Sequence, residues 1–230
     1  MFVDFDGTIA VDDTTDLILE RFADPAWREI EADWVAGKIG SRECLARQID
    51  LVRASPEALD ALADEAAFDP AFPAFVTYCQ IHDIPVTVIS DGLDRVAQTV
   101  LARAGVDVPV LANHLEWRGG DRWRLAFPYA VADCRSRAGH CKCVALTQTP
   151  YAMHMLIGDG RSDFCAAEGA DLVLAKGKLA EHCRNAGLPH IPFADFAEVH
   201  TVVAEWIESP RRRPRAARPP EIPVHAPTPA

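Results

Sequence analysis

The sequence has no long hydrophobic run. None of its apolar stretches approaches the roughly 20 residues that a helix needs to cross a bilayer. The N-terminus also carries Asp4 and Asp6 where a signal peptide would have a basic start followed by an apolar segment. We therefore expect no membrane partner and a cytoplasmic location.

Positive charge is also scarce. Lys and Arg together number 23 against 34 Asp and Glu, which gives a formal net charge of −11 at pH 7. Proteins that bind nucleic acid gain much of their affinity from basic side chains that neutralise phosphates, so nucleic acid is not an expected partner. An anionic substrate would need a locally positive site, which a bound divalent cation could supply.

The chain is large enough to bury a core without disulfide bridges. Its 230 residues are 49% hydrophobic and 25% charged, values of a globular protein with room for one core domain and an insertion. Its cysteines form an odd set, for which we expect reduced thiols: Cys44, Cys79, Cys134, Cys141, Cys143, Cys165 and Cys183. Cys134, Cys141 and Cys143, beside His140, could be a structural zinc site, a redox-sensitive thiol cluster or ordinary packing residues.

Strand patterns alternate with helical patterns through much of the chain. The spacing predicts strands at residues 1–6, 85–90, 108–111, 153–157 and 171–175, and a hairpin at 115–125. This order predicts right-handed crossovers and a mostly parallel, Rossmann-like α/β sheet with helices on both faces. The first strand is unusually short, so either it makes few ladder bonds or the sequence has lost residues at its start.

Residues 14–78 show helical spacing and no strand pattern. Breaks at residues 24–25, 37–41, 55–56 and 69–70 divide this stretch into about four helices. From residue 209 onward Pro, Arg and Ala dominate without a recurring apolar face. We expect a disordered tail there, whose arginines either remain solvated or touch an acidic partner.

Side chains able to perform phosphate chemistry occur at four places, three of them directly after an expected strand. Because the carboxyl ends of parallel strands converge on one crevice, we expect them to meet. They are Asp4-Phe5-Asp6-Gly7-Thr8, Ser90, Lys142 and Gly158-Asp159-Gly160-Arg161-Ser162-Asp163.

The carboxylates of this set predict a divalent cation. Asp4 and Asp6 are two residues apart on an extended chain and would point to the same side, and Asp159 adds a third acid. Mg²⁺ prefers such oxygen ligands. With the cation present, Asp4 could stay ionised and attack phosphorus while Asp6 holds the proton for the leaving oxygen.

The remaining polar residues fit the charge that phosphoryl transfer spreads over the equatorial oxygens. Thr8, Ser90 and Lys142 would face those oxygens. Asp163 would hold Lys142 or complete the surroundings of the metal. Arg161 would bind a substrate carboxylate or phosphate, or merely balance local charge.

The ordered set resembles the phosphatases of the haloacid dehalogenase (HAD) superfamily over about residues 1–207. The motif DxDxT matches residues 4–8, the Ser or Thr that closes a strand is Ser90, the Lys is Lys142, and GDxxxD matches residues 158–163. The resemblance implies that Asp4 is the nucleophile and Asp6 the general acid and base.

The resemblance also implies the ligands of the metal and the phosphate. Mg²⁺ would be held by Asp4, Asp159 and the backbone carbonyl of Asp6, with Asp163 near it. We expect substrate or phosphate contacts from Thr8, Ser90, Asp91, Gly92, Lys142 and Arg161.

The helical insertion resembles the cap of the phosphoserine-phosphatase-like branch, which closes over the substrate. We expect a HAD core in residues 1–13 and 73–208, a cap in 14–72 and a tail in 209–230. Residues 34–41 and 133–143 further resemble the methionine-salvage phosphatases of that branch. Ser90-Asp91-Gly92 departs from the Ser-Gly-Gly expected there.

The predicted activity is Mg²⁺-dependent hydrolysis of a phosphate monoester of a small metabolite through an aspartyl-phosphate on Asp4. One alternative is phosphotransfer to a small hydroxyl acceptor. Another is a non-catalytic sensor of a phosphorylated metabolite, against which the intact Asp4, Asp6, Lys142 and Asp159 count. A homodimer is the assembly considered.

Overall fold

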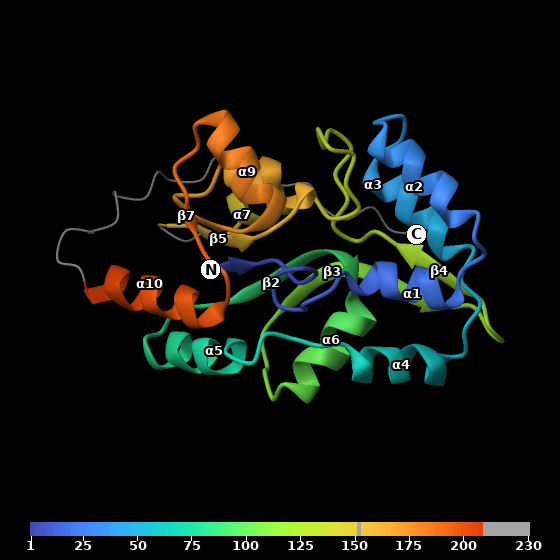
Figure 1. Ribbon diagram of the computed structural model, residues 1–230, viewed down its shortest axis with the longest axis horizontal. Helices are drawn as coiled ribbons and strands as arrows, with labels where there is room; N and C mark the ends of the chain where they lie inside the picture. The colour runs from blue at the N-terminus through green and yellow to red at the C-terminus, as the bar shows by residue number, and fades with distance from the viewer. Residues whose placement is uncertain (151–152, 209–230) are drawn as a thin grey trace.

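The computed structural model describes residues 1–150 and 153–208, which fold around a seven-stranded sheet (Figure 1). The predicted tail at 209–230 lies outside the described residues. The strand order is β4-β3-β2-β1-β5-β6-β7, parallel except for β4, which pairs antiparallel with β3. This confirms the predicted α/β class. The strands are β1 (Phe2–Val3), β2 (Thr87–Leu93), β3 (Val110–Trp117), β4 (Trp123–Ala126), β5 (Met155–Gly158), β6 (Leu172–Ala175) and β7 (Ile191–Pro192).

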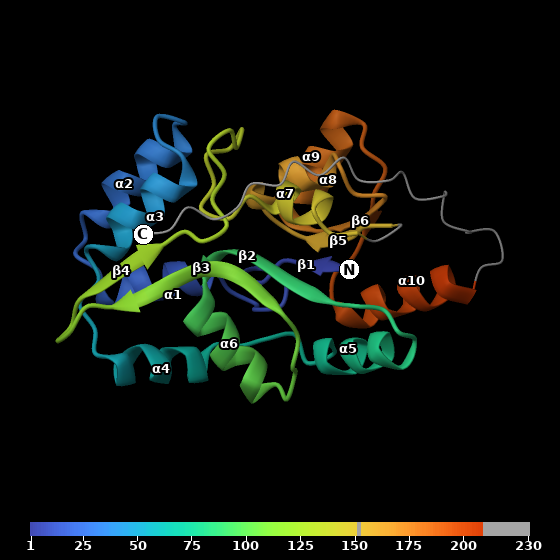
Figure 2. The same cartoon turned by 180° about the vertical axis from the view of Figure 1, so that it is seen from behind.

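Helices cover both faces of the sheet (Figures 1 and 2). One face carries α5 (Phe72–Ile81), α6 (Asp94–Arg103) and α10 (Phe196–Glu208), and the other carries α7 (Lys142–Thr147), α8 (Phe164–Ala167) and α9 (Gly177–Ala186). A 3₁₀ turn, η1 (Arg161–Asp163), leads into α8. Within the described ranges, no helix is long and apolar enough to cross a membrane.

Successive residues of each central strand pack alternately into the two hydrophobic layers. Phe2 and Ile89 pack toward α8 and α9, whereas their neighbours Val3 and Val88 pack toward α5, α6 and α10. Successive side chains of a strand point to opposite faces, so a short apolar run can fill two cores at once. This explains why strands of two to four residues are sufficient here.

β1 is short but central. Phe2 and Val3 pair with Thr87 and Val88 of β2 on one side and with β5 on the other. The first strand therefore makes few ladder bonds. The order of the parallel strands reverses at β1, and such a reversal opens a crevice beyond the carboxyl ends of the strands. Asp4 enters this crevice directly after β1, with its N–H bonded to the Ile157 carbonyl at 2.9 Å.

Five helices, not about four, occupy the stretch from residue 14 to residue 81. They are α1 (Thr14–Phe22), α2 (Trp27–Val35), α3 (Ser41–Ile49), α4 (Pro56–Glu65) and α5. α2 and α3 form the blue lobe in Figure 1, whereas α4 packs against α6 of the sheet layer. Arg95 of α6 binds Asp60 of α4 through two hydrogen bonds of 2.7 Å. The cap boundaries at residues 14 and 72 stay a prediction.

The edge of the sheet differs from the predicted pattern. The expected strands at 108–111 and 115–117 form the single strand β3, because Asn113 interrupts the apolar pattern without interrupting the backbone. The Asn113 side chain is fully buried and its amide donates to the Asp91 carbonyl at 2.6 Å. A buried polar group that finds such a partner does not break a strand.

The aromatic contact between α5 and α10 yields a stability prediction. Phe75 is fully buried, with its ring centroid 5.4 Å from that of Phe196. We expect Phe75→Ala to lower the free energy of unfolding by about 3–5 kcal/mol, measured by urea denaturation, because it leaves a cavity. Ile81→Ala, on the same helix at 73% exposure, is the control and should change it by less than about 0.5 kcal/mol. Equal losses in the two variants would contradict the packing described.

Candidate active site

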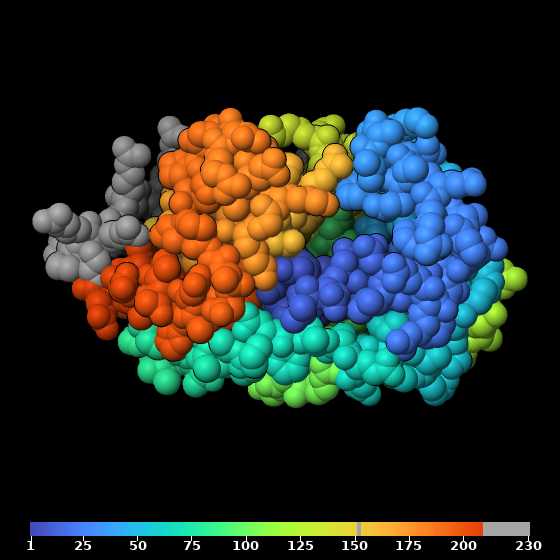
Figure 3. Space-filling model, viewed as in Figure 1, coloured from blue at the N-terminus to red at the C-terminus, as the bar shows by residue number. Residues whose placement is uncertain are grey.

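A pocket of about 510 Å³ opens beyond the carboxyl ends of β1, β2 and β5. In Figure 3 it lies in the hollow between the orange lobe, which contains α9, and the blue lobe of α2 and α3. Its floor carries residues from the first, second and fourth predicted motifs, and its far wall comes from α1 to α3. Among the lining residues are Asp4, Asp6, Ser90, Asp91, Gly92, Asp159 and Arg161.

Lys142 lies beneath this floor and joins two of the motifs. Its ammonium group donates to Asp4 Oδ1 at 2.5 Å, to Asp163 Oδ1 at 2.8 Å and to Ser162 Oγ at 2.9 Å. Lys142 and Asp163 are fully buried and Asp4 is 4% exposed. All three ammonium protons therefore have acceptors, which is the condition for burying such a charge.

The charges of this cluster perturb one another. Burial lowers the pKa of Lys142, but the carboxylates of Asp163 and Asp4 raise it more, so it lies above its ordinary value and the ammonium persists. Burial and then Asp163 raise the pKa of Asp4 well above its usual range, against the opposing effect of Lys142. The pKa of Asp159 is likewise raised, by burial and then by Asp163. The negative charge at the floor thus exceeds what Lys142 compensates.

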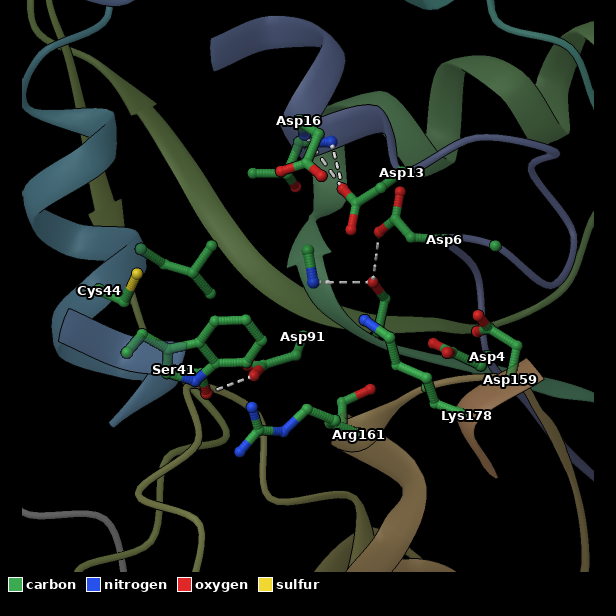
Figure 4. A pocket seen from close by; sticks show the side chains of 18 of the residues that line it. Asp4, Asp6, Asp13, Asp16, Ser41, Cys44, Asp91, Asp159, Arg161 and Lys178 are labelled. Carbon is green, nitrogen blue, oxygen red and sulfur yellow. Dashed lines mark hydrogen bonds between the residues drawn. The ribbon is translucent and has the colours of Figure 1, made fainter. Parts of the chain in front are cut away.

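The acidic cluster fits a hard divalent cation. Within the described part of the chain, oxygens of Asp4, Asp159 and Asp163 lie within 4.8 Å of one another. Figure 4 shows Asp4 and Asp159 side by side, with Asp6 nearby. Oxygen ligands and excess negative charge are what Mg²⁺ requires. The Asp6 carboxylate is not part of this set, so only its backbone carbonyl remains a candidate ligand.

The Asp6 side chain turns toward α1 instead. Its Oδ1 accepts from the Thr14 N–H at 2.8 Å and from the Thr14 hydroxyl at 2.6 Å, while Oδ2 accepts from Ser90 Oγ at 3.4 Å. Burial, followed by the negative charge of Asp13, raises the pKa of Asp6 to about 7 despite the Thr14 bonds. Asp6 can therefore hold or release a proton near neutral pH.

The backbone approaches these carboxylates closely at two glycines. Gly7 has φ +68°, and a Cβ placed there would lie 2.6 Å from Asp159 Oδ2. A Cβ at Gly92 would lie 2.4 Å from Asp6 Oδ2. Thr8 and Ser90 flank these glycines: Thr8 Oγ1 donates to Asp159 Oδ1 at 3.1 Å, and Ser90 Oγ accepts from the Gly92 N–H at 2.8 Å.

Two further predicted residues contact the helical lobe. The Asp91 carboxylate accepts from Ser41 Oγ at 2.6 Å and from the His140 N–H at 2.8 Å, so it links the start of α3 to the loop before Lys142. Arg161 lies over the Trp34 ring, 5.0 Å from its centroid. Asp91 is thus held by protein groups, and the guanidinium of Arg161 is stacked on α2 at the pocket wall.

Several residues that line the pocket or bond to its carboxylates were not predicted from the sequence. Thr14, Thr15, Glu31, Ser41 and Lys178 reach the site from α1, α2, α3 and α9. Thr14 follows the first motif by six residues and begins a helix, which offered the one local signal. Thr15, Glu31 and Ser41 depend on how α1 to α3 pack over the strand ends, and Lys178 depends on the position of α9.

The close approach at Gly7 generates a prediction. Gly7→Ala should abolish most of the catalytic activity, because the new methyl group would occupy the place of the Asp159 carboxylate. Gly105→Ala is the matched control: it has the same φ of +68°, so it carries a similar backbone strain, but its Cβ would meet nothing within 4 Å. Phosphate release per folded molecule, with folding followed by circular dichroism, measures the difference. Similar activity in the two variants would contradict this role of Gly7.

Comparison with known proteins identifies the family. The haloacid dehalogenase-like hydrolase family matches residues 1–168. A 2-hydroxy-3-keto-5-methylthiopentenyl-1-phosphate phosphatase from Brevibacillus brevis is 31% identical over 89% of this chain and 95% of its own length. The Pdp3-interacting factor 1 of Schizosaccharomyces pombe is 28% identical over 87% of this chain and 92% of its own.

Solved structures show the same fold. A phospho-aspartyl intermediate analogue of phosphoserine phosphatase matches 87% of this chain and 96% of its own, with a TM-score of 0.65 at 19% identity. A substrate-bound phosphoserine phosphatase gives a TM-score of 0.64 at 18% identity. The family predicted from the four motifs is confirmed: the chain belongs to the haloacid dehalogenase-like hydrolases, among the phosphoric monoester hydrolases of that family.

Proposed function

We propose that this protein is a magnesium-dependent phosphatase that cleaves a phosphate monoester of a small metabolite through an aspartyl-phosphate on Asp4. The observation that carries the proposal is the fixed, buried Asp4 carboxylate at the floor of a pocket. Lys142 and the Phe5 N–H both donate to Asp4 Oδ1, at 2.5 and 2.8 Å. We therefore assign the attack on phosphorus to Oδ2.

Neighbouring groups support this attack. Lys142, kept charged by Asp4 and Asp163, places a positive charge next to the position of the transferring phosphoryl group. Ser90 Oγ, between Asp6 and the Gly92 N–H, lies where it can donate to a phosphate oxygen. Donors fixed in advance where charge develops lower the barrier without further reorganisation.

Asp6 acts as the general acid and base in the proposed mechanism. Its protonated form gives a proton to the leaving alkoxide while the Asp4–phosphorus bond forms and the ester bond breaks. The resulting carboxylate then takes a proton from the water that attacks the phosphoryl group and releases Asp4. Thr14 fixes the carboxyl in one orientation throughout both steps.

The carboxylates of Asp4 and Asp159 and the backbone carbonyl of Asp6 are the proposed ligands of Mg²⁺. When bound, the ion would offset the negative charge of this site and polarise the phosphoryl group. Asp163 is assigned to Lys142, because its Oδ1 accepts from the ammonium at 2.8 Å.

The cap side of the pocket favours an uncharged, hydroxylated chain with an apolar part. Asp13, Asp16 and Glu31 disfavour a substrate carboxylate near them, whereas Trp34 and Leu45 provide apolar surface. Thr15 Oγ1 is buried and has no hydrogen-bond partner among the described residues, so a substrate hydroxyl could satisfy it. Together with the named relatives, these features support 2-hydroxy-3-keto-5-methylthiopentenyl-1-phosphate as the leading candidate substrate.

Asp4→Asn tests the mechanism. We expect phosphate release to fall by more than about 10³-fold, since a neutral amide cannot form the covalent intermediate. The assay uses a panel that includes phosphoserine and the methylthiopentenyl phosphate, each with Mg²⁺ and with EDTA. Full activity of Asp4→Asn, or equal rates with EDTA, would refute the mechanism. Tight binding of a panel member by the wild type without turnover would favour the sensor alternative, and phosphate transfer to added alcohols the phosphotransferase.

The raised pKa of Asp6 predicts a pH limit on the first step. Because the proton donor is protonated Asp6, the single-turnover release of the alcohol should decline as pH rises through about 7. Asp13→Asn removes a negative charge that raises this pKa, so the decline should move to lower pH. Asn still caps α1, and Asp12→Asn is the neighbouring control, which should leave the profile in place. A profile that shifts equally in both variants would contradict the assignment.

A further inference from the structure

Four cysteines gather around the Lys142 segment, and none of them is among the residues that line the pocket. Cys134 lies in the loop that follows β4, Cys141 and Cys143 flank Lys142 at the start of α7, and Cys165 lies in α8. Figure 2 shows α7 and α8 side by side, and the two helices pack against each other. Three separate segments thus contribute one set of sulfur atoms.

The sulfur atoms form a continuous chain of contacts. Cys141 Sγ lies 3.3 Å from Cys143 Sγ. The thiol of Cys134 interacts with that of Cys141, and the thiol of Cys165 with that of Cys143. Among the described residues, only Asp4, Asp159 and Asp163 place three ligand atoms within 4.8 Å of one another. The four sulfur atoms are therefore more widely spaced, and their side chains would have to rotate to surround an ion.

The surroundings are those of a sheltered metal site. Cys134 and Cys141 are 8% and 2% exposed and pack with Ala138, Val131 and Val144. Ser136 Oγ lies 3.3 Å from Cys134 Sγ, close enough to donate to a thiolate. The guanidinium of Arg135 interacts electrostatically with Cys143 and Cys165 and binds Glu168, so a positive charge stands beside the sulfurs.

The loop that carries Cys134 is long and has no regular secondary structure. Residues 127–141 contain no helix or strand, and loops of this length inside compact domains usually carry a function or a staple of their own. The loop ends next to the active site: the His140 N–H donates to Asp91, and Cys141 directly precedes Lys142. A cross-link between Cys134 and the end of this loop would fix the backbone at Lys142.

We propose that Cys134, Cys141, Cys143 and Cys165 bind one Zn²⁺ ion as a structural site that positions Lys142. Zinc takes four sulfur or nitrogen ligands in a tetrahedron, and soft thiolates select it over the hard cation of the oxygen site. The four thiols lose their protons as the ion binds. Cys165 lies two residues after Asp163, so the ion would tie together both segments of the Lys142 salt bridge.

The proposed ligand set differs from the one considered from the sequence, because Cys165 takes the place of His140. His140 is not included in the proposed set: its Nδ1 lies 3.2 Å from the Ser90 carbonyl oxygen, its ring lies beside Tyr129, and it also interacts with the Leu111 backbone. The fourth ligand is instead Cys165, which lies far from the other three in the sequence. The remaining cysteines, Cys44, Cys79 and Cys183, lie on other elements.

The test measures the metal in the full chain, reduced and saturated with Mg²⁺. We expect elemental mass spectrometry to measure about one zinc ion per chain. After removal of zinc by a chelator, Co²⁺ should give thiolate-to-cobalt charge-transfer bands in the near ultraviolet and strong tetrahedral bands in the red. Binding of Co²⁺ to the aspartate site would give no charge-transfer band, so the two sites are distinguishable.

Cys165→Ala should lose the charge-transfer band and most of the zinc, whereas Cys183→Ala, a fully buried cysteine of α9, should keep both. If Cys165→Ala does not fold, alkylation of the wild type decides: zinc should protect Cys134, Cys141, Cys143 and Cys165. A wild type that binds no zinc, cobalt spectra without thiolate bands, or a Cys141–Cys143 disulfide in the zinc-free native protein would each overturn the proposal. None of these readouts depends on phosphatase activity.

Discussion

The buried ammonium of Lys142 is the interaction on which the rest of the site depends. Burying an ion pair costs several kcal/mol of desolvation per ion, and the cost is offset only when every donor and acceptor is satisfied. Lys142 meets this condition with Asp4, Ser162 and Asp163, at 2.5 to 2.9 Å. The same contacts fix the Asp4 carboxylate, so stability and reactivity rest on one cluster.

The fold explains how partners so distant in sequence meet. Asp4 follows the central strand β1, and Asp163 closes the turn η1 that follows β5, the strand paired with β1. Lys142 arrives from α7, which packs on the same side of the sheet as α8. Glycines let the backbone lie against the carboxylates of the site: Gly7 against Asp159, Gly92 against Asp6 and Gly158 against Asp163. The crevice is therefore shaped by residues without side chains as much as by charged ones.

The sequence predicted where the central strands lie, because the periods of strands and helices are local, but not where they end: β1 stops at Val3 and β2 continues past Ser90 to Leu93. It did not predict what the helical lobe contributes, since Ser41 and Trp34 reach Asp91 and Arg161 only through tertiary packing. For the same reason the sequence did not predict that Cys165 lies near Cys134, Cys141 and Cys143. The role of the Asp6 side chain also depended on Thr14, whose position follows from the start of α1.

The charge balance at the floor favours the proposed cation although Lys142 is present. The carboxylates of Asp4, Asp159 and Asp163 outnumber the one ammonium by two. Burial and then the charge of Asp163 raise the pKa values of Asp4 and Asp159. A phosphate monoester brings further negative charge to this place. Lys142 is already committed to three acceptors, so it orients Asp4 but cannot neutralise both the site and the substrate. A divalent cation fits this deficit in number and in ligand type. Among the described residues that line the pocket, only Arg161 and Lys178 are basic, and the molecule as a whole has a net charge of −11.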